Sequence, residues 1–188
     1  MEAKREKDAC RALALSRRRA QSAGERHAHS LALCRLLESL PELRDAKAVL
    51  GYIPAGSECD LRPLYETLRR GGVTLAFPVT AADGIMEAYV PGDDLVPGLF
   101  GVPEPDPRLS RRLEPEELDA VLVPCVGFDD TLCRLGHGMG YYDRYLPRCT
   151  RAAAILTAFE AQRLDAVPRE PHDFSFRAAV TEKGVFRK

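Results

Sequence analysis

Apolar residues recur at helical spacing through the first forty residues of this 188-residue chain and predict two helices. The second helix is expected to begin near Ser22, because residues 22–25 have the Ser-x-x-Glu form of a capping box. The apolar side chains that continue it are Leu33, Leu36, Leu37 and Leu40. The first fifth of the chain is therefore expected to be helical.

Short apolar runs farther along the chain predict buried strands. They cover residues 48–53, 73–77, 118–123, 152–156 and 178–181. A proline closes each of the first two runs, and between them Asp60 is placed to cap a helix that ends at Gly71-Gly72. Strands that alternate with helices predict a single α/β domain over residues 1–188, with a mainly parallel sheet covered by helices on both faces.

Residues 80–107 have a different composition, in which glycine, proline and acidic residues surround one alternating segment at 85–90. This pattern predicts a hairpin or an excursion above the sheet. We expect it to form a flap that faces a substrate. Ligands of such sheets bind at the carboxyl ends of the strands, where Pro54 and Pro124 leave their strands.

The formal net charge of −1 argues against nucleic acid as the main partner, because binding to a phosphate backbone needs a clear basic excess. The three arginines at 17–19 are expected on the solvated face of the first helix. No apolar run approaches the ~20 residues of a membrane span, and no secretory signal is evident. We expect a soluble cytoplasmic protein, with mitochondria as the alternative compartment, that acts as a monomer on small molecules.

Six cysteines are scattered along the chain without a Cys-x-x-Cys pair. This spacing predicts no zinc site, and reduced thiols are typical of a cytosolic compartment.

The most specific chemical signal is the stretch Arg-Leu-Gly-His-Gly-Met-Gly-Tyr-Tyr-Asp at residues 134–143. Alternate glycines let backbone N–H groups approach an anion, and a helix beginning at Tyr141 would add its positive end. Arg134 supplies a forked cation for phosphate oxygens, and Asp143 is a candidate ligand for magnesium. The stretch therefore predicts a nucleotide triphosphate site.

The glycine spacing differs from both the Walker loop and the dinucleotide loop. A Gly-x-Gly-x-Gly run by itself is more often a structural turn. The flanking arginine, tyrosine pair and aspartate favour a ligand site over a turn.

These residues, with Val123-Pro124 and Gly127-Phe128-Asp129 before them, resemble the 5-formyltetrahydrofolate cyclo-ligase family, also called methenyltetrahydrofolate synthetases. The similarity runs from one end of the chain to the other. Its further elements are Lys7, Arg11 and Glu58 before the loop, and Ala158-Phe159, Gln162, Val167-Pro168 and His172-Asp173 after it.

The resemblance implies a NagB/RpiA-like three-layer fold and an ATP- and Mg²⁺-dependent closure of 5-formyltetrahydrofolate to 5,10-methenyltetrahydrofolate, with release of ADP and phosphate. Phosphorylation turns the formyl oxygen into a good leaving group, and N10 of the same folate then attacks the activated carbon. Phosphoryl transfer itself needs charge neutralisation and alignment more than a protein nucleophile.

The resemblance also implies a role for individual residues on the nucleotide side. Lys7, Arg11 and Arg134 would surround the triphosphate, and Asp143 with Asp173 would hold magnesium. The backbone cradle would comprise Leu135, Gly136, His137, Gly138, Met139, Gly140, Tyr141 and Tyr142. From spacing alone, Lys7 and Arg11 would be a solvated helix face, Asp143 a helix N-terminal charge and Tyr142 a packing residue.

On the folate side, the resemblance assigns Glu58 as the carboxylate that contacts folate. Ile53 and Phe100 would line the apolar part of the pocket, and Tyr52 is expected to belong to the core. His137 and Tyr141 would contact both ligands and, with Arg134, form the catalytic set. A histidine in this loop is also suited to simple donation to phosphate.

Four positions depart from the family pattern and are expected to be tolerated. Met139 stands where several members have lysine, Cys125 replaces a glycine, Phe100 replaces a tryptophan, and Arg177 replaces an acidic residue. The alternatives to the enzyme are a noncatalytic folate- or nucleotide-binding relative, a sugar-phosphate isomerase or acyl-transfer enzyme on the same fold, and a nucleic-acid-binding protein.

Overall fold

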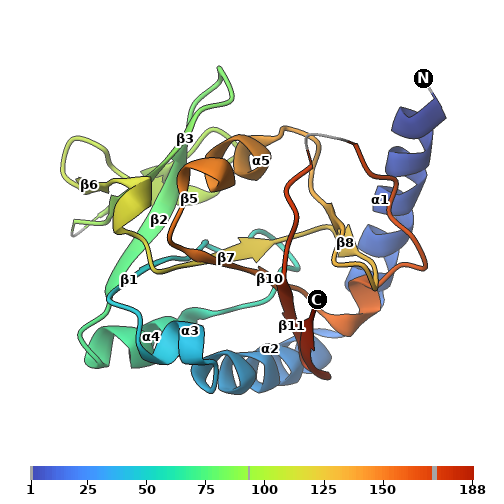
Figure 1. The fold of residues 1–188 in the computed structure, drawn as a ribbon, viewed down its shortest axis with the longest axis horizontal. Helices are drawn as coiled ribbons and strands as arrows, with labels where there is room; N and C mark the ends of the chain where they lie inside the picture. Colours follow the sequence, from blue (N-terminus) through green and yellow to red (C-terminus); the bar gives the residue numbers. More distant parts are fainter. Residues whose placement is uncertain (1, 93, 171–172) are drawn as a thin grey trace.

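The computed structural model describes residues 2–92, 94–170 and 173–188 (Figure 1). The two predicted N-terminal helices are confirmed as α1 (Glu2–Ala20) and α2 (Ala23–Glu38). Ser22 is the N-cap of α2: its side chain accepts from the Glu25 N–H, and the Glu25 carboxylate accepts from the Ser22 N–H. The capping box therefore sets the start of α2, as predicted.

An eight-stranded sheet has the order β12-β11-β10-β7-β1-β2-β3-β6. Its five central strands, β11 to β2 in that order, are parallel, and β12, β3 and β6 pair antiparallel at the edges. The strand bounds are β1 Ala48–Leu50, β2 Thr74–Thr80, β3 Met86–Val90, β6 Arg111–Leu113, β7 Ala120–Pro124, β10 Ala153–Thr157, β11 Ala178–Thr181 and β12 Gly184–Arg187. The predicted α/β class with a mainly parallel sheet is confirmed.

Helices cover both faces of the sheet, and the alternation of side chains along β1 shows how. Val49 packs into the core shared with α2, α3 (Pro41–Arg44) and α4 (Arg62–Arg70). Leu50, its neighbour, packs into the opposite core with α5 (Tyr141–Tyr145). In Figure 1, α2, α3 and α4 lie below the sheet and α5 lies above it.

Several boundaries differ from the sequence predictions. β1 ends at Leu50 rather than at residue 53, while β2 continues through Pro78 to Thr80 because β3 pairs along it. A proline is tolerated there because the pairing with β1 has already ended at Ala76. The N-cap of α4 is Leu61 and not Asp60, which was the predicted cap. Asp60 lies one residue before the cap, and its carboxylate accepts the Arg62 N–H. The edge strands β6 and β12 were missed because they have only three and four residues.

A hairpin lies between β7 and the glycine loop. Its strands are β8 (Gly127–Phe128) and β9 (Arg134–Leu135). The Asp129 carboxylate shapes the turn by accepting the Thr131 and Cys133 N–H groups, and it also accepts the Val167 N–H. The hairpin thus determines where Arg134 enters the loop.

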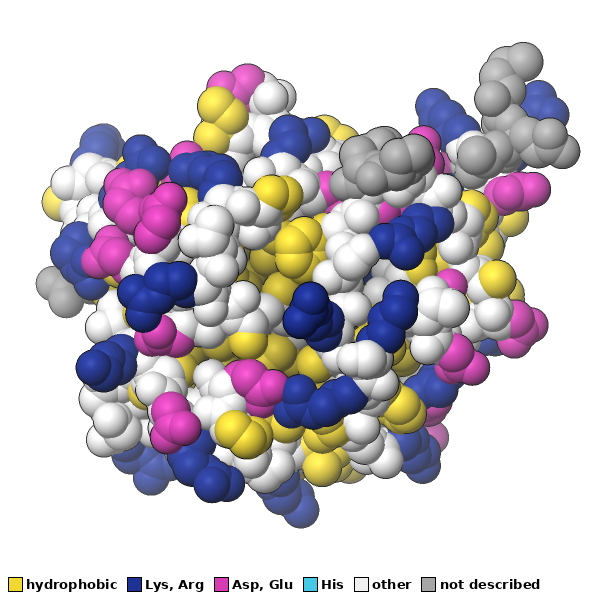
Figure 2. Space-filling model, viewed as in Figure 1, with side chains coloured by type: hydrophobic (Ala, Val, Ile, Leu, Met, Phe, Trp, Pro, Cys, Tyr) yellow, Lys and Arg dark blue, Asp and Glu magenta, His cyan; other side chains and the backbone are white. Residues whose placement is uncertain are grey.

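The predicted flap contains the β2–β3 hairpin and a small separate sheet of β4 (Leu95–Pro97) and β5 (Pro103–Pro105). Three short 3-10 helices complete the chain: η1 (Pro115–Glu117), η2 (Leu146–Arg148) and η3 (Glu160–Gln162). No helix in the described ranges is long and apolar enough to cross a membrane. On the face shown in Figure 2, basic and acidic side chains are interspersed without an extended patch of one sign.

Gly51, directly after β1, provides a test of the packing between the sheet and α4. A Cβ at Gly51 would lie 2.7 Å from the ring of Tyr65, whose hydroxyl is held by the Tyr52 N–H and C=O at 2.9 Å each. We expect Gly51→Ala to lower the free energy of unfolding by about 1–3 kcal/mol, because the ring has no room to move without losing these bonds. Urea unfolding followed by circular dichroism measures the change.

Gly24→Ala is the matched control, because a Cβ at Gly24 in α2 would meet no atom within 4 Å. It should leave stability unchanged or raise it by up to about 1 kcal/mol. Equal destabilisation by the two substitutions would contradict the packing argument.

Candidate functional site

A cavity of about 600 Å³ lies at the carboxyl ends of the parallel strands, between α1, the glycine loop and the flap. Residues at or just beyond the carboxyl ends of β1, β2 and β7 contribute to its wall, among them Ile53, Thr80 and Pro124. Every site residue predicted from the sequence lines this cavity. The fold therefore brings together side chains separated by up to 166 positions, such as Lys7 and Asp173.

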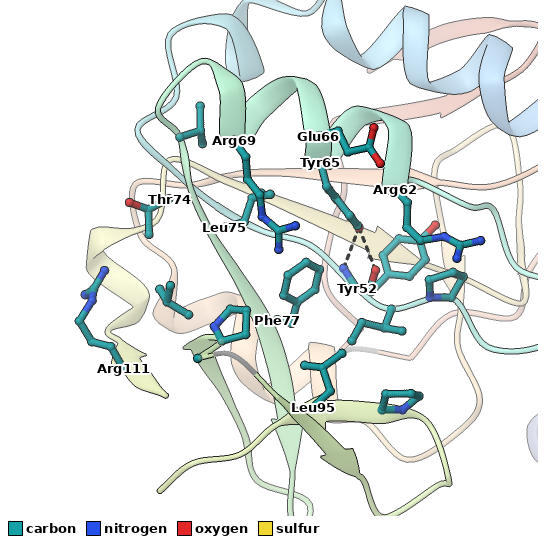
Figure 3. A pocket seen from close by; sticks show the side chains of 17 residues that line it. Tyr52, Arg62, Tyr65, Glu66, Arg69, Thr74, Leu75, Phe77, Leu95 and Arg111 are labelled. Carbon is teal, nitrogen blue, oxygen red and sulfur yellow. Dashed lines mark hydrogen bonds between the residues drawn. The ribbon is translucent and has the colours of Figure 1, made fainter. Parts of the chain in front are cut away.

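A second cavity, of about 930 Å³, adjoins the first and shares Tyr52, Ile53 and Pro103 with it (Figure 3). Its floor is aromatic and its charged residues, Arg62, Glu66, Arg69 and Arg111, are of both signs and exposed. None of the glycine-loop residues lines it. The smaller cavity is therefore the candidate site.

The glycine loop has the backbone geometry of an anion cradle. Gly138 and Gly140 have φ angles of 94° and 67°, which residues other than glycine rarely adopt. Within the described part of the chain, the backbone N–H groups of residues 136–140 donate to no protein acceptor. α5, which follows, has only five residues, so the expected contribution of a helix dipole is small. The unpaired N–H groups and the neighbouring guanidinium groups of Arg11 and Arg134 are therefore the main positive groups at the loop.

Arg134 and Arg11 flank the loop from opposite sides. Arg134 Nε donates to the Pro124 carbonyl at 3.1 Å, and its guanidinium lies over the Tyr142 ring at 5.1 Å. Arg11 Nε donates to the Gly136 carbonyl at 2.9 Å. Both guanidinium groups are thus fixed by their Nε atoms. Nη1 of Arg11 also donates to Asp8 Oδ1 at 2.6 Å, so an anion would be met by Nη2 of Arg11 and by the terminal nitrogens of Arg134.

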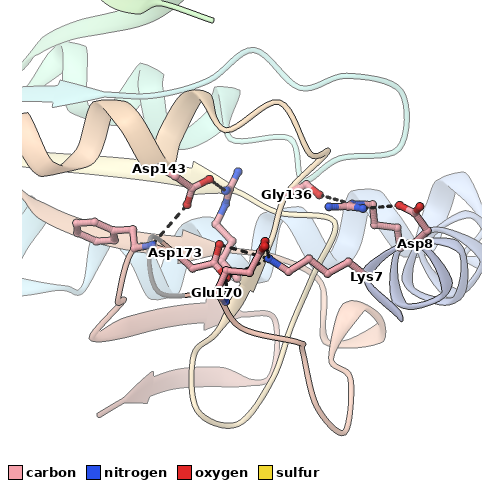
Figure 4. Close-up of polar contacts among 9 residues, drawn as sticks. Lys7, Asp8, Gly136, Asp143, Glu170 and Asp173 are labelled. Carbon is pink, nitrogen blue, oxygen red and sulfur yellow. Dashed lines mark hydrogen bonds and ion pairs between the residues drawn. The ribbon is translucent and has the colours of Figure 1, made fainter. Parts of the chain in front are cut away.

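Lys7 approaches the cavity from α1 and is held by two carboxylates (Figure 4). Its Nζ lies 2.6 Å from Glu170 Oε2 and 3.1 Å from Asp173 Oδ2. Burial opposes the charged amine, but the hydrogen bonds and charges of Glu170 and Asp173 raise the pKa of Lys7 above its ordinary value. The side chain of Lys7 is therefore protonated at neutral pH. His172, which belongs to the family resemblance, lies outside the described residues.

The two predicted magnesium ligands have different surroundings. Asp143 Oδ2 lies 3.7 Å from Arg134 Nη1, whereas Asp173 accepts from Lys7 and from the Glu170 N–H. The described residues contain no group of three or more His, Cys, Asp or Glu side chains suited to hold a metal alone. Any magnesium here would need phosphate oxygens or water to complete its coordination.

Glu58 is enclosed at the other end of the cavity, with a side chain that is 9% exposed. Its Oε2 accepts the Ala55 N–H at 3.0 Å, and its Oε1 lies 3.7 Å from Arg18 Nη1 and 3.6 Å from His137 Nε2. The carboxylate thus faces α1 on one side and the glycine loop on the other.

Arg18 was expected on the solvated face of α1, and this prediction is wrong. Its side chain is only 6% exposed, and its Nε donates to Ser57 Oγ at 3.0 Å. A sequence signal for this was present, because positions 7, 11, 14 and 18 lie on one face of a helix. Ala14, at the centre of this face, is fully buried.

Aromatic and apolar side chains form the remaining wall. The ring of Phe100, from the flap, meets the Tyr141 ring edge-to-face at 5.9 Å, and the Tyr141 hydroxyl donates to the Ala81 carbonyl at 2.8 Å. Tyr52 is 3% exposed, in agreement with its expected place in the core, although it also borders the cavity. Burial raises the pKa of Tyr52 and Tyr142, so both phenols stay neutral.

Glu104 is a charged cavity residue that the sequence did not identify. It lies in β5, is 8% exposed, and accepts from the Thr80 hydroxyl at 2.7 Å and from the Thr80 N–H at 3.1 Å. An isolated glutamate between prolines carries no periodic or motif signal, so only the folded flap shows that it is buried beside the cavity.

Comparison with known proteins gives consistent matches. The 5-formyltetrahydrofolate cyclo-ligase family model matches residues 3–182. The 5-formyltetrahydrofolate cyclo-ligase of Mycolicibacterium smegmatis is 34% identical over 145 residues, which cover 73% of this chain and 74% of that protein.

Two solved structures share the fold over nearly the whole chain. The NMR structure of Aquifex aeolicus 5,10-methenyltetrahydrofolate synthetase has a TM-score of 0.84 and 34% identity, covering 96% of this chain and 92% of that one. The 5,10-methenyltetrahydrofolate synthetase from Mycoplasma pneumoniae has a TM-score of 0.79 and 26% identity, covering 94% and 99%. The resemblance predicted from the glycine loop is confirmed: the chain belongs to the 5-formyltetrahydrofolate cyclo-ligase family.

Proposed function

We propose that this chain converts 5-formyltetrahydrofolate to 5,10-methenyltetrahydrofolate, and that it uses ATP and Mg²⁺ and releases ADP and phosphate. The observation that carries the proposal is the convergence of Lys7, Arg11, Glu58, Arg134 and the glycine loop on one cavity in a member of this family. A folate and a nucleotide in the same cavity would bring the γ-phosphate next to the formyl group.

The nucleotide end of the cavity would lie at the glycine loop. Unpaired backbone N–H groups of residues 136–140 supply donors to phosphate oxygens, and Arg134, Arg11 and Lys7 supply the charge. Met139 brings no cation, and its side chain is half exposed. Lys7, Arg11 and Arg134 are therefore the basic side chains that would face the phosphates.

The charge of the cavity supports the involvement of magnesium. Its lining includes three permanent cations, Lys7, Arg11 and Arg134, against five carboxylates, Glu58, Glu104, Asp143, Glu170 and Asp173, which gives 3 − 5 = −2. A triphosphate entering alone would add to this negative charge. Asp143, with Asp173 after it releases Lys7, would hold Mg²⁺ together with phosphate oxygens, and the ion would neutralise charge during phosphoryl transfer.

The folate would occupy the apolar end, between Ile53, Phe100 and Tyr141, with Glu58 accepting from its N–H groups. The formyl oxygen attacks the γ-phosphorus of ATP, the bond from phosphorus to the ADP oxygen breaks, and ADP leaves. N10 then attacks the formyl carbon, its proton is lost, and the C–O bond breaks to release phosphate. Arg134, His137 and Tyr141 surround the reacting groups and would stabilise the transferring phosphoryl oxygens.

A near-ultraviolet absorbance time course tests the proposed function. Purified protein with 5-formyltetrahydrofolate, Mg²⁺ and ATP should produce the methenyl absorbance band, and omission of ATP should abolish it. A flat trace in the complete mixture, with folate binding still detected by calorimetry, would favour a noncatalytic relative.

The role of Arg134 is tested by Arg134→Met, which keeps the apolar stem and removes the guanidinium. We expect the KM for ATP to rise by at least about tenfold, since one charge-assisted contact to phosphate is lost. Steady-state kinetics at saturating folate measures it. Arg151→Met is the control, because Arg151 is exposed and does not line the cavity. Unchanged ATP kinetics in a folded Arg134→Met protein would contradict the assignment.

A further inference from the structure

We infer that Arg18 is a positioning residue that fixes the Glu58 carboxylate at the cavity wall and balances its charge, so that Glu58 is ready to accept hydrogen bonds from the folate. The inference rests on the proposed function, because it assigns Glu58 to the folate. Arg18 itself does not line the cavity. It acts through Glu58 and touches no substrate.

The side chain of Arg18 is buried, with 6% of its surface exposed. A buried charge is costly unless it is paired and hydrogen-bonded. In the described part of the chain, this group donates one hydrogen bond, from Nε to Ser57 Oγ, and Nη1 is buried without a hydrogen-bond partner. Nη1 lies 3.7 Å from Oε1 of Glu58. A shortening of about 0.8 Å would complete a charge-assisted hydrogen bond between them.

Other titratable groups also interact with Glu58, among them Tyr52, Cys59, Cys125 and Tyr142, together with His137 from the glycine loop. Burial raises the pKa of Tyr52, Cys59 and Tyr142, and raises that of Cys125 to about 12, so these four are neutral near pH 7. Among these described neighbours, Arg18 is therefore the permanently charged partner of Glu58.

The backbone around Glu58 is held in a turn that Arg18 also contacts. Glu58 belongs to a turn in which its N–H donates to the Ala55 carbonyl at 3.2 Å and its carboxylate accepts the Ala55 N–H. Arg18 donates a hydrogen bond to the Ser57 hydroxyl of this turn and lies 3.7 Å from the Glu58 carboxylate, so it contacts two neighbouring residues of the turn. Because Arg18 shares its helix face with Lys7 and Arg11, α1 links the two ends of the cavity.

The test is a double-mutant cycle between Arg18→Met and Glu58→Gln, with KM measured separately for folate and ATP. We expect Arg18→Met to raise the folate KM by about tenfold and to change the ATP KM by less than about twofold. In the Glu58→Gln background, Arg18→Met should produce no further change in the folate KM. Arg18→Lys should recover most of the loss, because it restores the charge.

Arg19→Met is the matched control: Arg19 is the next residue of the same helix, carries the same charge and is exposed. It should behave as the unmodified protein. Arg18→Gln, which keeps a donor for Ser57, replaces Arg18→Met if the latter does not fold. Equal increases in both KM values, or full additivity with Glu58→Gln, would overturn the inference.

A failure of the inference about Arg18 can be distinguished from a failure of the proposed function. If the unmodified protein shows no turnover, the proposed function fails, and calorimetric folate affinities of the same variants still decide the role of Arg18. Loss of folate affinity in Arg18→Met but not in Arg19→Met, absent in the Glu58→Gln background, would support it. Equal folate affinities in Arg18→Met and the unmodified protein would refute it.

Discussion

The close approach of α1 to the β8–β9 hairpin is the contact on which the site depends. Ala14 is fully buried in a small core with Val126, Leu135 and Leu164. A Cβ on Gly127 would lie 3.2 Å from that of Ala14, so the two backbones approach this closely only because both residues are small. Docking of α1 at this point places Lys7 and Arg11 beside the glycine loop and Arg18 behind Glu58. Displacement of the helix would remove charged groups from both ends of the cavity at once.

The free protein already balances the charges that a nucleotide would use. Glu170 and Asp173 pair with Lys7, and Asp143 lies near Arg134, so incoming phosphates would compete with carboxylates for the same cations. Such an exchange costs less than creating isolated charges, because each cation keeps an anionic partner before and after binding. The excess of carboxylates in the cavity would make a divalent cation a favourable companion of a bound nucleotide.

Much of the fold follows from the sequence because its signals are local. Three examples show this. The capping box at Ser22 predicts the start of α2, the apolar run predicts β7, and the two glycines predict the end of α4. The candidate site was predicted because the residues around the glycine loop form a long family motif. Arg18 and Glu104 were missed for different reasons. Arg18 shares a helix face with Lys7, which could have indicated that it faces the protein. Because arginine is usually exposed, its residue type instead led to the prediction of a solvated position. Glu104 is buried by a flap contact with Thr80 that no local pattern encodes.

Hydrogen–deuterium exchange in the presence of ATP, Mg²⁺ and 5-formyltetrahydrofolate tests the central claim, which is that the ligands bind between α1 and the glycine loop. Amide protection reports where a ligand stabilises the backbone. The account predicts that ligands slow exchange in peptides covering residues 134–146 and 2–20, and leave α4, which lines the larger cavity, unchanged. Protection concentrated in α4, with no effect on the glycine loop, would show that the ligands bind in the other cavity and would contradict the account.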